Sequence, residues 1–380
     1  MREKLRIAID GRPALWPRTG IGTIVSNVLD RISNFDSTNQ YFAYFNSDPA
    51  ISSRSWDQFE KRSGGPRQKL LWANTWLPGQ LKQDDIDVFI TFLDKEIPLV
   101  PTRSQIVCMV HDLIPLKFPE TVFRNLAHQL YYSALIRAAI RRADIILTNS
   151  DYSRREILSA LGARESKIRK ITLGVDRATF YDRASTDKVL KRNGLRAPFV
   201  LALGSTEPRK NNVRVLEAVR RLRADYPDLS LAIAGNNWRG KVFDSRLLDH
   251  SVRLLGHVSD EDLPVLMQSA EMLVFPSLHE GFGLPVIEAM ALGVPVVTSN
   301  AAALPEVAED AALLVNPRDV DQISLAMRRI LEDHNLADDL RRRGRARASN
   351  FRWETTCKEL VSLCEGLTYG HAPRTEPVTP

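Results

Sequence analysis

Short apolar runs of β-forming residues alternate with segments of helical spacing along almost the whole chain. Examples are LRIAIDG at residues 5–11, QIVCMVHD at 105–112 and FVLALGS at 199–205, which all end in small or polar residues. Continuously apolar runs of this kind are typical of strands buried on both faces of a parallel sheet, with helices as the connections. The pattern therefore predicts an α/β fold.

The alternation forms two series, which are separated near residues 175–190. The length of 380 residues also exceeds what one hydrophobic core usually supports. We therefore predict two α/β domains, at residues 1–180 and 181–352, and a Pro- and Thr-rich tail at 368–380.

The composition is that of a soluble globular protein, with 44% hydrophobic and 26% charged residues. No run approaches the roughly 20 apolar residues that a membrane-spanning helix needs, and the apolar stretch of MREKLRIAID is too short for a signal peptide. The three cysteines, Cys108, Cys357 and Cys364, cannot all pair and lack the spacing of a zinc site. We predict a cytoplasmic protein with free thiols.

A net charge of +6 allows anionic partners such as nucleotide diphosphates, nucleic acids and anionic lipids. Without a zinc finger, an RNA-binding aromatic motif or a long basic tract, we predict no nucleic-acid partner. The segment Arg67–Gln83 combines Trp72, Trp76 and Leu77 with basic residues. It is either a helix that rests on a membrane surface or a core helix whose tryptophans pack inward.

The segment Ser277–Val297 carries the strongest chemical signal. Residues 280–283, EGFG, predict a turn between a strand and a helix, with Pro285 at the first helical position. The glycines allow a ligand to approach the backbone, and the helix N-terminus offers N–H groups to an anion. Glu280 and Glu288 can each accept hydrogen bonds from two neighbouring hydroxyls. Alternatively, these acids only complement the helix dipole.

A second segment, Leu201–Asn212, places Arg209 and Lys210 after the end of a strand. Arginine offers a forked donor and lysine a mobile ammonium, a combination suited to a diphosphate. A basic pair in the first turn of a helix opposes the helix dipole, so we expect an anion beside it. The alternative is a basic pair on the surface.

Two weaker signals follow strands of the first domain, where ligands bind in an open α/β sheet. TGIGT places Gly20 and Gly22 after the first strand, although a tight turn explains this motif equally well. VHDLIP places His111 where it can donate to a sugar hydroxyl or a phosphate, with Asp112 orienting the ring. A structural histidine is the alternative.

Taken in this order, the segments resemble the family-four retaining glycosyltransferases, over about residues 5–367. The most specific match is EGFGLPVIEAMA followed by GVPVV, in which seven residues separate two glutamates. GSTEPRKN and LLGHVSDEDLPVLMQSAEMLVFPS match further motifs. FRWE near Phe351 resembles the point where the chain crosses back to the first domain, which implies a terminal helix at 353–367 that packs on that domain. The resemblance implies the GT-B fold, in which two Rossmann-like domains face each other across a cleft.

The same resemblance implies roles for individual residues. Arg209 and Lys210 would hold the donor diphosphate, Glu280 would lie beside the transferred sugar, and Glu288 would bind the ribose. His111 would lie near the donor sugar. The other implied donor-binding residues are Gly20 or Gly22, Ser205, His257 and Val258 at the base, and Gly281, Phe282, Gly283 and Leu284. Two departures from the family pattern are GIG in place of GG and Pro208 before the basic pair.

The resemblance also implies retention at the anomeric carbon without a metal or other cofactor, the leaving group being stabilised by cations and a helix N-terminus. The tripeptides at 85–87 and 319–321 have the Asp-x-Asp pattern of metal-dependent glycosyltransferases. Because the first precedes a strand and the second opens a helix, we predict that both are structural.

HDLIPLKFPE and DGRP resemble segments of bacterial polysaccharide mannosyl- and rhamnosyltransferases. This resemblance implies transfer of mannose from GDP-mannose to a glycan or lipid-linked glycan acceptor, in the cytoplasm or peripherally on the inner membrane. The alternatives are a UDP- or dTDP-sugar donor, or a non-catalytic nucleotide-binding partner protein.

Overall fold

The computed structural model describes residues 4–16, 20–51, 54–176, 183–204, 206–236, 243–244 and 248–369. The chain divides into two compact units, each with its own parallel sheet and hydrophobic core. The first unit comprises Met1–Leu116, Phe123–Gly174 and Arg352–Pro380, and the second comprises Lys117–Val122 and Val175–Phe351.

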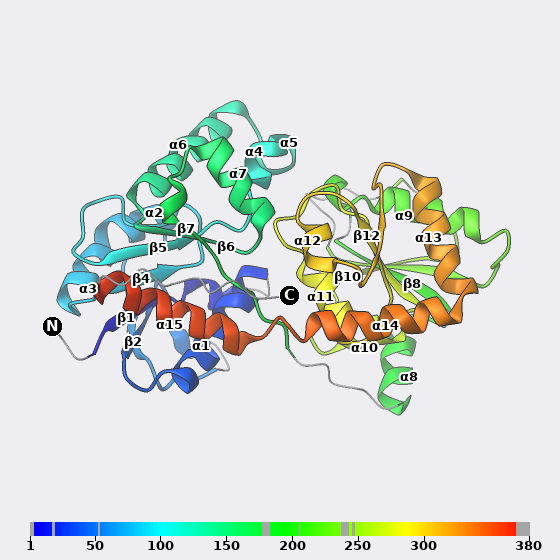
Figure 1. Cartoon of the computed structure of the whole chain (residues 1–380), viewed down its shortest axis with the longest axis horizontal. Helices are drawn as coiled ribbons and strands as arrows, with labels where there is room; N and C mark the ends of the chain where they lie inside the picture. The colour runs from blue at the N-terminus through cyan, green and yellow to red at the C-terminus, as the bar shows by residue number, and fades with distance from the viewer. Residues whose placement is uncertain are drawn as a thin grey trace. The chain divides into compact units, whose positions relative to one another are not determined.

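The sheet of the first unit has seven parallel strands in the order β3-β2-β1-β4-β5-β6-β7 (Figure 1). In chain order the strands are β1 (Arg6–Asp10), β2 (Gln40–Phe45), β3 (Glu60–Ser63), β4 (Val88–Thr91), β5 (Gln105–Met109), β6 (Ile145–Thr148) and β7 (Ile168–Lys170). The order reverses between β1 and β4, so the loops that follow these two strands are neighbours at the carboxyl edge of the sheet.

The helices of the first unit cover this sheet. They are α1 (Gly20–Phe35), α2 (Lys69–Leu71), the π-helical turn η3 (Trp72–Trp76), α3 (Leu77–Gln83), α4 (Ile114–Lys117), α6 (Leu126–Arg142), α7 (Asp151–Leu161) and α15 (Trp353–Tyr369), with the 3₁₀ turns η1 (Arg12–Leu15), η2 (Pro49–Ile51) and η4 (Glu165–Lys167). The terminal helix α15 packs beside α1, as the sequence predicts (Figure 1). Glu359 of α15 accepts a hydrogen bond of 2.8 Å from the backbone N–H of Thr172, which anchors the helix to the loop after β7.

The sheet of the second unit has six parallel strands in the order β10-β9-β8-β11-β12-β13. The strands are β8 (Phe199–Leu203), β9 (Ser230–Ala234), β10 (Val252–Gly256), β11 (Met272–Phe275), β12 (Val296–Ser299) and β13 (Leu313–Val315). The helices are α5 (Pro119–Val122), α8 (Arg183–Arg192), the 3₁₀ turn η5 (Pro208–Lys210), α9 (Asn212–Leu222), α10 (Asp262–Ser269), α11 (Leu284–Ala291), α12 (Leu304–Ala308), α13 (Val320–Glu332) and α14 (His334–Ala348). Helix α9 packs beside α13, and α11 beside α14 (Figure 1).

The predicted α/β fold with two Rossmann-like sheets is confirmed, because the apolar runs form central strands. All five residues of β8 are buried, as are all four of β11. Strands β3, β7 and β10, which lie at the edges of the sheets, were not predicted from the sequence. In β3 and β10 the charged or exposed residues interrupt the apolar pattern.

The tight turn that was the alternative explanation for TGIGT is not formed by its described residues, because α1 begins at Gly20 and includes Gly22 in its first turn. Gly22 is buried against the rest of the unit. The glycines therefore begin the helix and do not form a separate loop ahead of it.

The segment Arg67–Gln83 is part of the core of the first unit. Trp72 and Leu77 are fully buried, and the Trp72 indole N–H donates to the carbonyl of Gly64 at 2.9 Å. Trp76 stacks on Trp72 with ring centroids 5.3 Å apart. The tryptophans pack inward, so of the two interpretations the core helix is confirmed.

The three cysteines are buried and free. Burial raises the pKa of the Cys108 thiol to about 12, so this sulfur stays protonated and unreactive. Within the described ranges, no helix is both long enough and apolar enough to cross a bilayer.

Candidate functional site

The strand order of the second unit reverses between β8 and β11, which are hydrogen-bonded neighbours. In an open α/β sheet, ligands bind beyond the carboxyl ends of the strands at such a reversal. The loop after β8 carries Arg209 and Lys210, and the loop after β11 carries Glu280. The strand order thus brings together two sequence motifs that lie about 70 residues apart.

Glu280 receives three donors on one carboxylate oxygen. The distances to its Oε1 are 2.8 Å from Lys210 Nζ and 2.7 Å from Arg209 NH1. The hydroxyl of Ser277 donates to the same oxygen at 2.6 Å. Arg209 also donates to Glu207 Oε1 at 2.8 Å and to the carbonyl of His279 at 2.7 Å. The two cations are therefore held in fixed positions by the two loops.

These charges are largely removed from water. The exposed fraction of the side chain is 8% for Arg209, 17% for Lys210 and 12% for Glu280. Burial alone would raise the pKa of Glu280, but the charges of Lys210 and Arg209 and the hydrogen bonds from Lys210 and Ser277 outweigh it and lower the pKa. The Glu280 carboxylate is thus ionised at neutral pH.

The anion beside the basic pair Arg209–Lys210 belongs to the protein itself. The sequence predicts an anion beside Arg209 and Lys210, and in the structure Glu280 and Glu207 supply it. The pair also lies in the 3₁₀ turn η5 ahead of α9, whose first residue is Asn212. The basic pair by itself therefore does not require an external anion.

Two backbone positions need glycine to bring these side chains together. Gly204 has φ +97°, and a Cβ there would lie 2.4 Å from Cγ of Lys210. Gly283 has φ +119°, and a Cβ there would lie 2.6 Å from a methyl carbon of Leu304. L-residues rarely adopt these conformations. Gly204 thus leaves room for the stem of Lys210 to pass.

Asn211 ties the loops of the second unit together. Its φ is +65°, and its side-chain amide donates to the carbonyls of Pro276 at 3.0 Å and Pro317 at 2.5 Å. Pro276 follows β11 and Pro317 follows β13. The residue after the basic pair therefore fixes the loop that carries it to two other strand ends.

The turn at residues 281–283 is buried and leads into α11. Leu284 is the first residue of α11, so Pro285 occupies the second helical position and not the predicted first. Glu288 is half-buried on the next turn. The ring of Phe282 meets Phe351 edge-on at 5.7 Å, which makes its side chain a packing element of the second unit.

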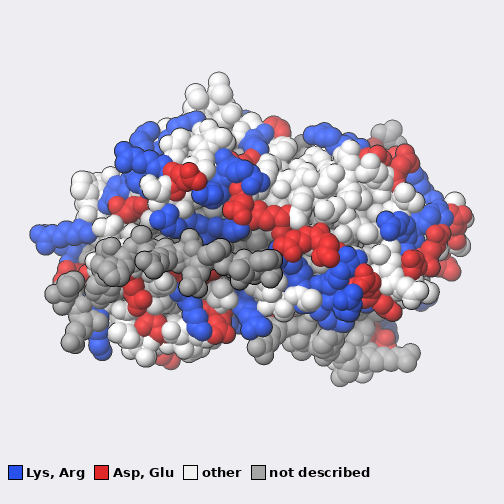
Figure 2. Space-filling view, in the orientation of Figure 1, with Lys and Arg blue, Asp and Glu red and all other residues white. Residues whose placement is uncertain are grey.

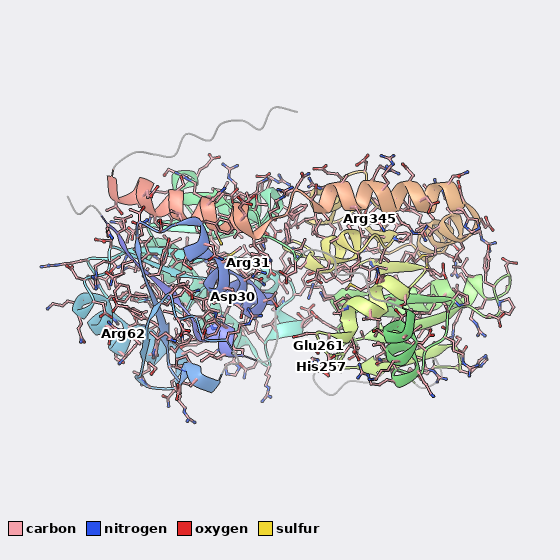
Figure 3. The ribbon with its side chains drawn as sticks, turned by 90° about the horizontal axis from the view of Figure 1, so that it is seen from below. Asp30, Arg31, Arg62, His257, Glu261 and Arg345 are labelled. Carbon is pink, nitrogen blue, oxygen red and sulfur yellow. The ribbon has the colours of Figure 1, made fainter. Side chains whose placement is uncertain are left out.

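His257 and Val258 directly follow β10, two strands from β8. His257 is exposed and lies on the same loop as Glu261 (Figure 3). Ser205 lies outside the described residues.

The first unit has its own predicted site residue, His111, at the end of β5. Its Nε2 lies 3.0 Å from the carbonyl oxygen of Phe92, and Ser153 donates to the His111 carbonyl at 3.0 Å. Burial lowers the pKa of His111, and the hydrogen bond to Phe92 opposes this shift only in part. The Asp112 carboxylate accepts a hydrogen bond from the N–H of Ile114 at 2.9 Å. The hydrogen bond that the structure gives to the His111 ring is the one with the carbonyl of Phe92.

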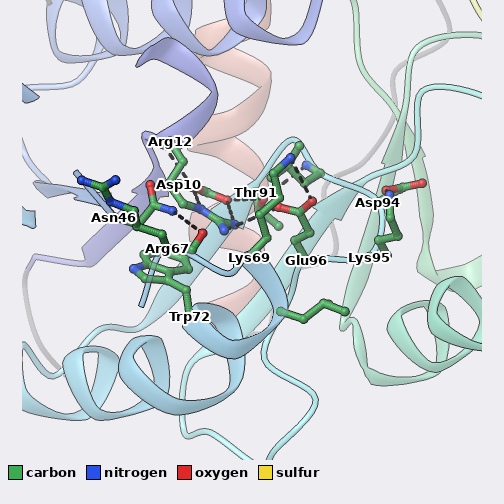
Figure 4. A network of polar contacts seen from close by, with 12 residues as sticks. Asp10, Arg12, Asn46, Arg67, Lys69, Trp72, Thr91, Asp94, Lys95 and Glu96 are labelled. Carbon is green, nitrogen blue, oxygen red and sulfur yellow. Dashed lines mark hydrogen bonds and ion pairs between the residues drawn. The ribbon is translucent and has the colours of Figure 1, made fainter. Parts of the chain in front are cut away.

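A buried polar network that was not predicted from the sequence lies at the strand-order reversal of the first unit (Figure 4). Asp10 accepts from Arg12 Nε at 2.8 Å and NH2 at 2.7 Å, and from the hydroxyl of Thr91 at 2.9 Å. The Arg12 guanidinium lies over the ring of Trp72, 4.0 Å from its centroid, and NH1 is 3.5 Å from Glu96 Oε2. An Asp and an Arg two residues apart at the end of the first strand were the available signal.

The two Asp-x-Asp tripeptides have structural tasks, as predicted. Asp87 accepts the N–H of Arg6 at 2.8 Å, which joins β4 to β1. Asp319 caps α13 by accepting the N–H of Gln322 at 3.0 Å. Among the described residues, no group of three or more His, Cys, Asp and Glu side chains is arranged to hold a metal ion.

Two doubly wound parallel sheets, with a terminal helix that returns to the first, define the GT-B class of glycosyltransferases. The structure of Anabaena Alr3699/HepE in complex with UDP-glucose has a TM-score of 0.74 to this chain, with 19% identity, and covers 96% of this chain and 100% of that one. At this identity the likeness concerns the fold alone.

Sequence comparison then identifies the family. Residues 186–347 match Glycosyl transferases group 1, and residues 53–179 match Glycosyltransferase Family 4. The chain belongs to the family-4 glycosyltransferases.

The relatives that match include two mannosyltransferases of Escherichia coli. O-antigen chain mannosyltransferase B is 34% identical over 244 residues, 61% of this chain and 63% of the relative. Serotype-specific mannosyltransferase WbdA is 31% identical over 280 residues, 71% of this chain and 34% of the relative. The matched part thus spans less than two thirds of either relative.

Proposed function

We propose that this protein is a retaining hexosyltransferase that moves mannose from GDP-mannose to a glycan or lipid-linked glycan during bacterial surface polysaccharide synthesis. The names of the E. coli relatives support the sugar and the type of product. The convergence of Arg209 and Lys210 on one carboxylate, at the strand-order reversal of the second unit, is the observation that carries the proposal.

In this proposal residues 181–352, nearly all of which belong to the second unit, form the donor-binding domain. Arg209 and Lys210 bind the diphosphate, Glu288 binds the ribose, and the backbone at His257 and Val258 contacts the base. The N–H groups of residues 281–284, together with Ser205, complete the donor site. Until the donor arrives, Glu280 keeps both cations in place; once the diphosphate binds to them, Glu280 accepts hydroxyls of the sugar.

The chemistry follows from the same charges. As the anomeric carbon–oxygen bond breaks, its electron pair goes to the departing phosphate, where the two fixed cations stabilise the new charge without a metal. The acceptor hydroxyl forms the new bond on the same face and gives its proton to the departing phosphate. No covalent nucleophile is needed when departure and attack share one face.

Residues 1–180, most of which belong to the first unit, are proposed with the helix at 353–367 as the acceptor-side domain. His111 and the glycines Gly20 and Gly22 would act on the donor from this unit, as the family resemblance implies. Its strand-order reversal, with Asp10, Arg12 and Glu96, offers a second ligand position of the kind found in open α/β sheets.

Two experiments test the proposal. A thermal-shift panel of GDP, UDP and dTDP ranks the donor nucleotides, because a ligand stabilises the state that it binds. We expect the largest shift with GDP, and a larger shift with UDP or dTDP would replace GDP-mannose as the donor. Release of GDP from GDP-mannose that depends on a mannan-type acceptor separates a transferase from a non-catalytic nucleotide-binding protein.

A further inference from the structure

Helix α6 of the first unit exposes large apolar side chains on the side that faces away from the core. Leu126, Leu130 and Tyr131 have exposed fractions of 65%, 61% and 57%. They are three of the four most exposed large hydrophobic residues in the part of the chain that the structure describes, and they fall within six positions. Single exposed leucines are ordinary on a protein surface, but such a group marks an interaction site.

The other side of α6 already accounts for its packing. Tyr132, Ile136, Ala139 and Ile140 are buried in the core of the first unit, at the spacing of one helix face. Folding therefore requires only this face to be apolar. Because the three exposed side chains lie on a different face, the core does not explain them.

The same outer face becomes basic toward the end of the helix. Arg137 and Arg141 are exposed and follow Leu130 at helical spacing. The sequence of α6, LAHQLYYSALIRAAIRR, contains no Asp or Glu. Neither arginine forms an ion pair with a carboxylate of the described residues; Arg137 donates to the carbonyl of Ser133 on its own helix, at 3.2 Å.

Leu126, Leu130, Arg137 and Arg141 thus lie along one stripe of α6, at spacings of four and seven residues, and Tyr131 is exposed beside it. We call Leu126, Leu130, Tyr131, Arg137 and Arg141 the α6 surface; it extends over about 22 Å of helix. Figure 2 shows uncharged atoms at the tip of the first unit, over α6, with Lys and Arg side chains beside them. The stripe joins an apolar half to a basic half with no carboxylate in it.

We propose that the α6 surface docks on an anionic phospholipid bilayer. A helix that lies in the plane of a membrane buries leucine and aromatic side chains at the headgroup boundary and directs basic residues at the lipid phosphates. The two leucines and Tyr131 are the inserted group, and Arg137 and Arg141 pair with the phosphates. The absence of acids on this described helix fits a negative bilayer surface better than a mixed protein surface.

The inference goes beyond the proposed function, because it concerns where the enzyme works and involves neither the donor site nor sugar transfer. The tryptophans of Arg67–Gln83 are in the core, so this segment is not the membrane contact. The proposal assigns that contact to α6, whose large apolar residues are exposed.

Sedimentation of the full chain with lipid vesicles tests the proposal. We expect the protein to pellet with vesicles of equal parts phosphatidylglycerol and phosphatidylcholine and to remain in solution with phosphatidylcholine alone. The triple variant Leu126→Ser, Leu130→Ser, Tyr131→Ser should bind at least about tenfold more weakly. The variant Arg137→Ala, Arg141→Ala should lose roughly tenfold to thirtyfold in affinity at low salt, and the difference should shrink as salt rises.

The second unit offers matched controls. Leu325 of α13 is 58% exposed, and the Arg342 side chain of α14 is 74% exposed. Leu325→Ser and Arg342→Ala should sediment like the unchanged protein. Unchanged melting temperatures and GDP-induced thermal shifts show that the α6 variants are folded and keep the donor site, so a failure of the docking idea is separate from a failure of the proposed function.

Three results would overturn the proposal. They are a wild-type protein that stays in solution with anionic vesicles, an α6 triple variant that pellets like wild type, and a Leu325→Ser variant that loses as much binding. If analytical ultracentrifugation shows instead a dimer that the triple variant abolishes, without vesicle binding, the surface belongs to a second copy of the chain.

Discussion

Replacing Glu280 by Gln keeps the shape of the side chain and removes its charge. The carboxylate oxygen that now receives Arg209, Lys210 and Ser277 becomes a neutral amide. Arg209 retains Glu207, while Lys210 loses its carboxylate at a position where only 17% of its side chain is exposed.

Breaking a buried ion pair from one side costs about 3–5 kcal/mol, because the remaining charge is left without its partner. We take the lower end, about 3 kcal/mol, since the Gln carbonyl still accepts one hydrogen bond. In a unit of this size that lowers the melting temperature by roughly 6–12 °C. Differential scanning calorimetry measures this change in melting temperature. The control is Glu271→Gln, because the Glu271 side chain makes no hydrogen bond or ion pair with the described residues and its replacement should leave the melting temperature unchanged.

The same variant should respond more strongly to nucleoside diphosphate. When residue 280 is neutral, its side chain no longer competes with the diphosphate for Lys210, so GDP should bind more tightly and restore most of the lost melting temperature. A melting temperature within about 2 °C of wild type would show that the pair is not stabilising and would refute this reasoning. A weaker GDP-induced shift in Glu280→Gln than in wild type would refute the competition between Glu280 and the diphosphate.

The remaining predictions concern the same site. The pKa of Glu280 is lowered in the folded state, so the carboxylate stabilises the fold fully above the ordinary carboxyl pKa of about 4 and loses this effect as pH falls below it. The difference in melting temperature between wild type and Glu280→Gln should therefore disappear only in acid. A difference that disappears near pH 7 would contradict the direction of the pKa shift. Lys210→Ala should lower kcat by about 10²–10³ in steady-state assays, and near-normal turnover would remove Lys210 from the chemistry. Gly204→Ala should destabilise the protein by roughly 1–3 kcal/mol in chemical denaturation, because of its φ of +97° and the 2.4 Å approach to Lys210, while Gly79→Ala, with open space around its Cβ, should not. Turnover should be unaffected by EDTA, and its abolition would show that a metal takes part.

The sheets were predictable because their central strands are buried on both faces and need apolar residues throughout. Edge strands have no such requirement: β3 reads EKRS and alternates between exposed and partly buried residues. Its identity as a strand comes from pairing with β2, a long-range contact that the local sequence does not encode. The place of the glycines of TGIGT could not be decided from the sequence for a related reason, since only the tertiary fold shows that the buried Gly22 lies inside a helix.

The candidate site shows the same limit. The sequence identifies Arg209, Lys210 and Glu280 as residues with chemistry, but that they pair with one another follows from the adjacency of β8 and β11. The network of Asp10, Arg12 and Glu96 depends likewise on the adjacency of β1 and β4. The sequence motifs therefore identify the residues with chemical function, and the strand order determines which of these residues are in contact.

The carboxylate that holds Arg209 and Lys210 has a consequence for the speed of the catalytic cycle. Under the proposed function, the nucleoside diphosphate product would remain on the same two cations after sugar transfer, and a site with unsatisfied cations would retain it tightly. Glu280 Oε1 lies 2.7 Å from Arg209 NH1 and 2.8 Å from Lys210 Nζ. If the proposed donor site is correct, the return of Glu280 to these cations would offset the loss of the diphosphate, and product release would not depend on the next donor.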